Sequence, residues 1–165
     1  MTPVEVKAQV KPESLTTAFS STETVTGIVY FSCGSIAFPE DVWDDFPVII
    51  VGWWLNNLAE YLSGDDGRSV ELGFMDGPFY VLLSLGSNMG SSIRAEMIRD
   101  QFSDCDQVLH TAMTDVRTLY RSIDEVAGTL IEFCNRQPTA VKDYSDLVEA
   151  RQRALDAFLY RFGPK

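Results

Sequence analysis

The sequence predicts an α+β fold, in which an antiparallel sheet is packed by helices within a single compact domain. β-Branched and aromatic residues fill positions 25–38, as is typical of a strand. Asp76-Gly77 separates two short apolar stretches, which is a hairpin signal. Toward the C-terminus apolar residues recur every three or four positions, the spacing of a helix that buries one face. The 165 residues, 45% of them hydrophobic, are enough for one core.

The N-terminal part is predicted to contain a polar segment followed by a strand. Residues 1–24 include a cluster of serine and threonine and form a polar lead-in, whose start either frays or adds an edge strand to the domain at 25–165. The strand at 25–38 is expected to break at Gly34 and to end at Pro39.

The next segment, 44–63, combines a strand-like run of apolar residues with helical spacing. Asp44 or Asp45 can cap the first amides, and Pro47 is compatible with a first helical turn. Gly64 suits a left-handed position after the last turn. These start and stop signals favour one long, largely buried helix.

Four strands are predicted in the middle of the chain. Residues 70–74 and 79–85 form a hairpin around Asp76-Gly77. The segment 93–100 is predicted as a strand in preference to a helix, and 107–115 as a strand with a helix as the alternative.

Two helices are predicted to close the chain. Ser122-Ile-Asp-Glu125 has the pattern of a capping box and opens the first helix, which Pro138 ends. The second helix begins at 143–145 and ends before Gly163-Pro164.

The acidic charge of the chain narrows its choice of partners. With 24 acidic and 13 basic residues, the formal net charge is −11. Nucleic acids and anionic membrane surfaces would repel such a protein, whereas a basic protein would attract it. Between Phe38 and Asp76 nine acidic residues stand against Arg68 as the one base, which predicts a localised acidic surface.

The sequence offers no recognisable catalytic or cofactor motif, and we predict that the protein is not an enzyme and needs no cofactor or metal. Its one histidine, His110, lies in an apolar run without a second ligand at metal-binding spacing. Its three cysteines are an odd number without a CxxC pair, which argues against a disulfide framework. Because no apolar run reaches the roughly 20 residues of a bilayer span and the start lacks a signal core, we expect a cytoplasmic protein.

The paired carboxylates have local structural explanations. Helix capping accounts for Asp44 and Asp45, and a turn after Gly64 accounts for Asp65 and Asp66. Trp43 keeps two interpretations. Surrounded by carboxylates, it is either a binding residue that meets lysine or arginine, or a hydrophobic staple beside the start of the helix.

Three sequence motifs resemble those of immunity proteins from bacterial polymorphic-toxin and contact-dependent inhibition systems. The motifs are Phe38-Pro-Glu-Asp-Val-Trp-Asp-Asp-Phe46, Gly52-Trp-Trp-Leu55 and Phe74-Met-Asp-Gly-Pro-Phe-Tyr-Val81. The resemblance is close over 38–81 and holds only in outline for the helical end. It implies a compact α+β domain that binds and neutralises a cognate toxin domain without chemistry of its own.

The resemblance and the acidic charge point to the same kind of partner, a basic toxin domain such as a nuclease. We expect the toxin contacts to come from Asp41, Trp43, Asp44, Asp65 and Asp66. An adaptor or chaperone-like role in another bacterial complex is the alternative function, and a carboxylate-dependent hydrolase comes after it. Both a monomer and a homodimer are compatible with the sequence.

Overall fold

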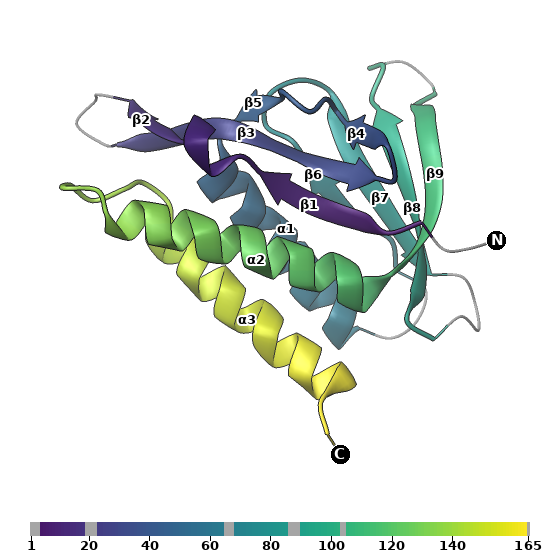
Figure 1. Cartoon of the computed structure of the whole chain (residues 1–165). Coiled ribbons are helices and arrows are strands. Elements are labelled where there is room, and N and C mark those ends of the chain that lie inside the picture. The colour runs from purple at the N-terminus through teal and green to yellow at the C-terminus, as the bar shows by residue number, and fades with distance from the viewer. Residues whose placement is uncertain (1–3, 19–22, 65–67, 86–89, 103–104, 165) are drawn as a thin grey trace.

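The computed structural model describes residues 4–18, 23–64, 68–85, 90–102 and 105–164. These residues form an α+β fold with antiparallel sheets and three helices (Figure 1). The strands divide between two sheets where the sequence predicted one. Along the described chain, five strands with one short 3-10 helix come first, followed by a long helix, four further strands and two closing helices.

The first sheet is built around one long strand, β3 (Thr24–Cys33). The four other strands all pair antiparallel with it: β1 (Val6–Val10), β2 (Thr16–Ala18), β4 (Ile36–Phe38) and β5 (Asp44–Asp45). The short 3-10 helix η1 (Pro12–Ser14) separates β1 from β2. Gly34, with φ +58°, forms the turn between β3 and β4, which confirms the predicted break in this strand.

The second sheet is an antiparallel meander in which each strand pairs with the next. Its strands are β6 (Val70–Gly73), β7 (Phe79–Leu85), β8 (Ser92–Arg99) and β9 (Gln107–Asp115). The predicted hairpin around Asp76-Gly77 is confirmed, as are the two following strands. The positive φ of Gly77, +77°, is the backbone conformation that this turn needs.

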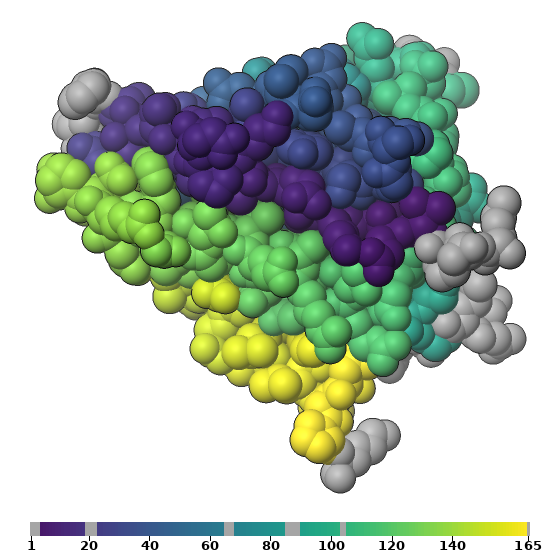
Figure 2. All heavy atoms as spheres, viewed as in Figure 1, coloured from purple at the N-terminus to yellow at the C-terminus, as the bar shows by residue number. Residues whose placement is uncertain are grey.

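Helix α1 (Pro47–Ser63) lies at the centre of the molecule. It packs against β3 and β6, one strand from each sheet, and also against α2 (Val116–Asn135) and α3 (Tyr144–Phe162). In Figure 1, α1 lies behind the first sheet and α2. Figure 2 shows that the atoms of these elements cover this face of the molecule. A helix surrounded in this way is apolar on nearly every side, which explains why its sequence also looked like a strand.

Three predicted helix caps are wrong. α1 has Phe46 as its N-cap residue with no side-chain cap bond, and Gly64 after it is extended, with φ −87° and ψ 165°. Ser122 does not open a helix, because α2 already begins at Val116, where the carboxylate of Asp115 accepts the amide of Arg117 at 2.7 Å. That capping lets the chain pass directly from β9 into α2.

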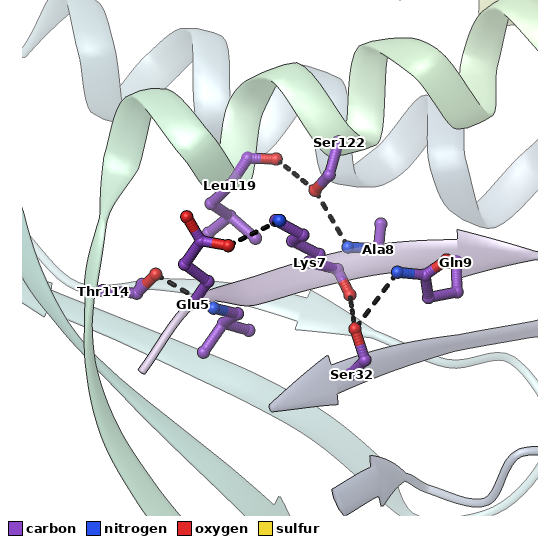
Figure 3. Close-up of polar contacts among 9 residues, drawn as sticks. Glu5, Lys7, Ala8, Gln9, Ser32, Thr114, Leu119 and Ser122 are labelled. Carbon is purple, nitrogen blue, oxygen red and sulfur yellow. Dashed lines mark hydrogen bonds and ion pairs between the residues drawn. The ribbon is translucent and has the colours of Figure 1, made fainter. Parts of the chain in front are cut away.

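Strand β1 is fastened along its outer edge by two side-chain hydroxyls (Figure 3). The amide of Val6 donates to Thr114 Oγ1 of β9 at 3.1 Å, and the amide of Ala8 donates to Ser122 Oγ of α2 at 2.9 Å. Thr114 and Ser122 are both buried. The edge strand is therefore joined to the second sheet and to α2 by hydrogen bonds that bulk water cannot replace.

Candidate functional site

The chain between β4 and α1 places two neighbouring aspartates on opposite sides of a strand. β5 pairs with β3 so that Asp44 lies opposite Ile28 and Asp45 opposite Gly27. Because successive side chains of a strand point to opposite faces, Asp44 is exposed to solvent whereas Asp45 is buried, with 2% of its surface accessible. The two carboxylates therefore have different roles.

Asp45 is the one buried carboxylate among the residues that the structure describes, and it accepts four hydrogen bonds. Its Oδ1 accepts the amide of Phe46 at 2.7 Å. Its Oδ2 accepts the indole Nε1 of Trp43 at 3.2 Å and the amides of Met75 and Asp76 at 3.1 and 3.2 Å. This one side chain therefore ties the segment before α1 to the β6–β7 turn, and its role is structural.

Trp43 packs on the same turn. Its ring meets Phe74 and Phe79 edge to face, with centroid distances of 6.4 and 5.2 Å, and its N–H is engaged by Asp45. Gly77 lies so close that a Cβ built there would be 2.9 Å from the indole Cη2. Trp43 is half-buried, and it holds the turn in place through these contacts.

A third segment joins this region through the backbone. The amide of Asp100, just after β8, donates to the carbonyl of Pro78 at 2.8 Å. We call residues 39–46, 74–79 and 99–102 together the acidic surface. These three segments contain six carboxylates and, in Arg99, one basic side chain.

Four carboxylates of the acidic surface are exposed to solvent, namely those of Glu40, Asp41, Asp44 and Asp76. Exposed apolar side chains lie within the same three segments: Val42 with 59% of its surface accessible, Met75 with 39% and Phe102 with 88%. Exposed apolar side chains beside a charged rim are compatible with a protein-binding surface.

The structure brings together some of the sequence-predicted contact residues. Asp41 and Asp44 lie exposed on the acidic surface, and Trp43 between them in the chain is half-buried. Asp65 and Asp66 fall outside the described residues. Sequence reasoning assigned Asp45 to helix capping and Asp76 to the turn, and counted both among the nine acidic residues of 38–76. It missed that Asp45 is buried and that its carboxylate accepts the amide of Asp76.

One cavity of about 300 Å³ lies between α1 and α3 and has carboxylates in its lining. Arg153 at this cavity donates to Glu149 at 3.1 Å and to Asn56 Oδ1 at 2.6 Å. The bond to Asn56 crosses from α3 to α1, whereas the bond to Glu149 lies within α3.

Metal-ligand clusters and cysteine thiols are the remaining candidates for chemistry. Over the described ranges, no group of three or more histidine, cysteine or acidic side chains could hold a metal ion. All three cysteines are free thiols, and burial raises the pKa of Cys134 to about 11 and also raises that of Cys33. At neutral pH these two thiols are protonated and are therefore weak nucleophiles.

In comparisons with protein-family models, with curated proteins and with solved structures, nothing matches this chain. Within the part of the chain that the structure describes, no helix is both long and apolar enough to span a membrane.

Proposed function

We propose that this protein is a non-catalytic immunity protein, which binds and neutralises a cognate bacterial toxin domain through the acidic surface. The observation that carries the proposal is the gathering of four exposed carboxylates, Glu40, Asp41, Asp44 and Asp76, on two segments that Asp45 ties together. The likeness of the 38–81 motifs to immunity proteins supports the same function.

Charge determines which partner this surface fits. Like charges on a partner would be repelled, whereas a patch of lysine and arginine would be drawn in over distances of about 10 Å at moderate salt. The catalytic surface of a nuclease is basic because it binds phosphates. Carboxylates docked there would occupy the phosphate positions and block substrate.

The support beneath the surface favours fast binding. Asp45 and Trp43 fix the two segments in one arrangement before a partner arrives. Little conformational entropy is then lost on docking, and long-range attraction sets the association rate.

The proposal is tested by charge reversal combined with rescue of growth. Glu40, Asp41, Asp44 and Asp76 are changed together to lysine, and the variant is co-expressed with a candidate toxin domain from a neighbouring gene. A matched control changes four exposed carboxylates elsewhere to lysine: Glu13, Glu60, Glu125 and Asp156. Both variants alter the net charge by the same amount, so any difference reports the position of the charges.

We expect the control to rescue growth and the acidic-surface variant to fail, with its association slowed by about tenfold or more at low salt. Circular dichroism checks that both variants are folded. Equal rescue by the two variants would remove the acidic surface from the mechanism. A wild-type protein that neither binds nor protects against the toxin would overturn the immunity function for that toxin.

A further inference from the structure

Gly73 is a glycine that the fold itself does not require. It lies in β6 opposite Tyr80 of β7, in a pairing without a bulge. It lacks the positive φ that favours glycine, and a Cβ built on it would meet nothing within 4 Å. A glycine inside a strand weakens that strand, because it packs no side chain and loses more entropy on folding. The remaining common role of such a glycine is to let another molecule approach the backbone closely.

The aromatic ring opposite Gly73 does not cover it. Leu72 is fully buried, so Gly73 and its partner Tyr80 lie on the solvent face of the second sheet. An aromatic side chain can pack over a glycine on the paired strand. Here the Tyr80 hydroxyl instead donates to Asp106 Oδ2 at 2.5 Å, on the far side of β8. The ring therefore leans over β8, where Ile98 is only 4% accessible, and leaves the space over Gly73 open.

The backbone beneath this space is held in place by α1. The carbonyl of Gly73 accepts the indole N–H of Trp54 at 2.7 Å, and the carbonyl of Glu71 accepts Asn57 Nδ2 at 2.6 Å. A group that binds over Gly73 thus meets a backbone that is already fixed, so little conformational entropy is lost on binding.

Carboxylates surround the space over Gly73. Glu71 lies two residues earlier on the same face, is exposed, and makes no ion pair within the described residues. Burial raises the pKa of the Tyr80 phenol above its ordinary value, and the charges of Asp106, Glu71 and Asp100 raise it further. The three carboxylates therefore act on the same side chain, and the space beside it is electrostatically negative.

The basic side chain at the end of β8 does not neutralise this space. Arg99 lies opposite Phe79, with its guanidinium 6.0 Å from the centre of that ring, on the other face of the sheet. What the space offers a ligand is a bare backbone, an aromatic ring and carboxylates. A guanidinium matches all three, because it is planar, stacks on aromatic rings and pairs with a carboxylate through two hydrogen bonds.

We propose that the space over Gly73 binds an arginine side chain of the protein partner, with the guanidinium lying on the Gly73 backbone beside Tyr80 and paired with Glu71. This inference rests on the proposed function, because it adds a contact with the same basic toxin domain. The space adjoins the acidic surface: Gly73 directly precedes its segment 74–79, and Asp100 belongs to its segment 99–102. The acidic surface attracts the partner over distance, whereas the contact at Gly73 slows its release.

The test fills the space while leaving the fold intact. Gly73→Val places a branched side chain over the backbone, and valine favours strands, so the urea midpoint should equal or exceed that of the wild type. The matched control is Ser84→Val, which adds bulk to the same face of β7 about 13 Å from Tyr80. Surface plasmon resonance measures binding of each variant to a candidate toxin domain from a neighbouring gene.

We expect Gly73→Val to weaken binding by about tenfold or more through faster dissociation, with little change in the association rate. Ser84→Val should bind as the wild type does. Glu71→Gln keeps the size of the side chain and removes its charge, so it should also speed dissociation. If Gly73→Val fails to fold, Gly73→Ala decides the question, because its Cβ has free space and should still weaken binding by a smaller factor.

A double-mutant cycle identifies the side chain on the partner. Each exposed arginine of the toxin domain is changed to lysine, and each change is measured against the wild type and against Glu71→Gln. One of these changes should weaken binding to the wild type and have little further effect on binding to Glu71→Gln. If no arginine is coupled to Glu71 in this way, the proposed contact does not exist.

The outcomes separate this inference from the proposed function. If Gly73→Val binds as tightly as the wild type while the fourfold lysine variant of the acidic surface does not bind, the proposed function stands and the contact at Gly73 is refuted. Equal weakening by Ser84→Val and Gly73→Val would also refute it, because the whole face of the sheet would then be sensitive. A wild type that binds no such toxin domain would remove both.

Discussion

Ser122 Oγ accepts the backbone amide of Ala8 at 2.9 Å, although the two residues are 114 positions apart in the chain. The same hydroxyl donates to the carbonyl of Leu119 at 2.8 Å. Both groups are buried, so neither can exchange this bond for one to water. One hydroxyl thus joins the N-terminal strand to the helix that follows the second sheet.

Replacing Ser122 with alanine should lower the free energy of unfolding by about 1–3 kcal/mol, because the buried amide of Ala8 loses its acceptor. Urea denaturation measures the change. Ser145→Ala, at an exposed position of α3, is the control and should shift stability by less than about 0.5 kcal/mol. Equal effects of the two substitutions would contradict a structural role for the Ser122 bond.

Replacing Asp44 and Asp45 with alanine, one at a time, should lower the free energy of unfolding by very different amounts. Asp45→Ala leaves four N–H donors without their shared acceptor and should cost about 3 kcal/mol or more of unfolding free energy. Asp44→Ala removes an exposed carboxylate and should cost less than about 0.5 kcal/mol. Thermal and urea unfolding of the pair test this, and similar midpoints for both variants would refute it.

Tyr120 should make the protein sensitive to alkaline pH. Burial raises the pKa of its phenol to about 12, and the nearby Asp124 carboxylate adds to this effect. The unfolded phenol loses its proton near pH 10. Between these two values the unfolded state binds fewer protons than the folded state, so the free energy of unfolding falls as pH rises from about 10 to 12.

Tyr120→Phe should remove this fall in the free energy of unfolding at alkaline pH, which is on the order of 1–2 kcal/mol. At neutral pH the substitution should be neutral or slightly stabilising, because the buried hydroxyl has no hydrogen-bond partner among the described residues. Urea denaturation at neutral and alkaline pH measures both effects. Tyr160→Phe, at a side chain that is 86% accessible, serves as the control, and an equal alkaline shift in both variants would count against this assignment.

Two glycines with positive φ offer a matched test of how closely Trp43 packs. Gly90, with φ +61°, has nothing within 4 Å of a built Cβ, so Gly90→Ala should cost only the roughly 1–2 kcal/mol of a left-handed alanine. Gly77→Ala adds a clash with the indole and should cost at least about 1 kcal/mol more. Urea denaturation compares the two, and equal losses would show that the indole moves freely.

Much of the fold could be predicted from local patterns. The alternation of apolar and polar residues, together with the Asp76-Gly77 turn, was enough to predict the strands of the second sheet, because a hairpin depends on residues that are close in sequence. The strand-like run at the start of α1 was resolved correctly by Pro47. The caps failed because Asp45 and Ser122 satisfy backbone groups on distant segments, Met75 and Ala8, which no local rule relates to them.

The candidate site was predictable in composition and not in arrangement. The excess of acidic residues over 38–76 indicated a charged region, and Asp41 and Asp44 do lie on the acidic surface. Charge counting treats Asp44 and Asp45 alike, whereas pairing of β5 with β3 buries one and exposes the other. Asp100 joins the region through a backbone bond to Pro78, which side-chain patterns cannot reveal.

Because Asp45 is buried, the residue that supports these segments is not one of those that set the charge of the surface. Glu40, Asp41, Asp44 and Asp76 are exposed to solvent, whereas Asp45, which holds their segments together, is buried. Mutations at these four positions can accumulate over generations and redraw the electrostatic pattern while the scaffold keeps its shape. A lineage of such chains would be free to diversify in what it recognises as long as the aspartate at position 45 is retained.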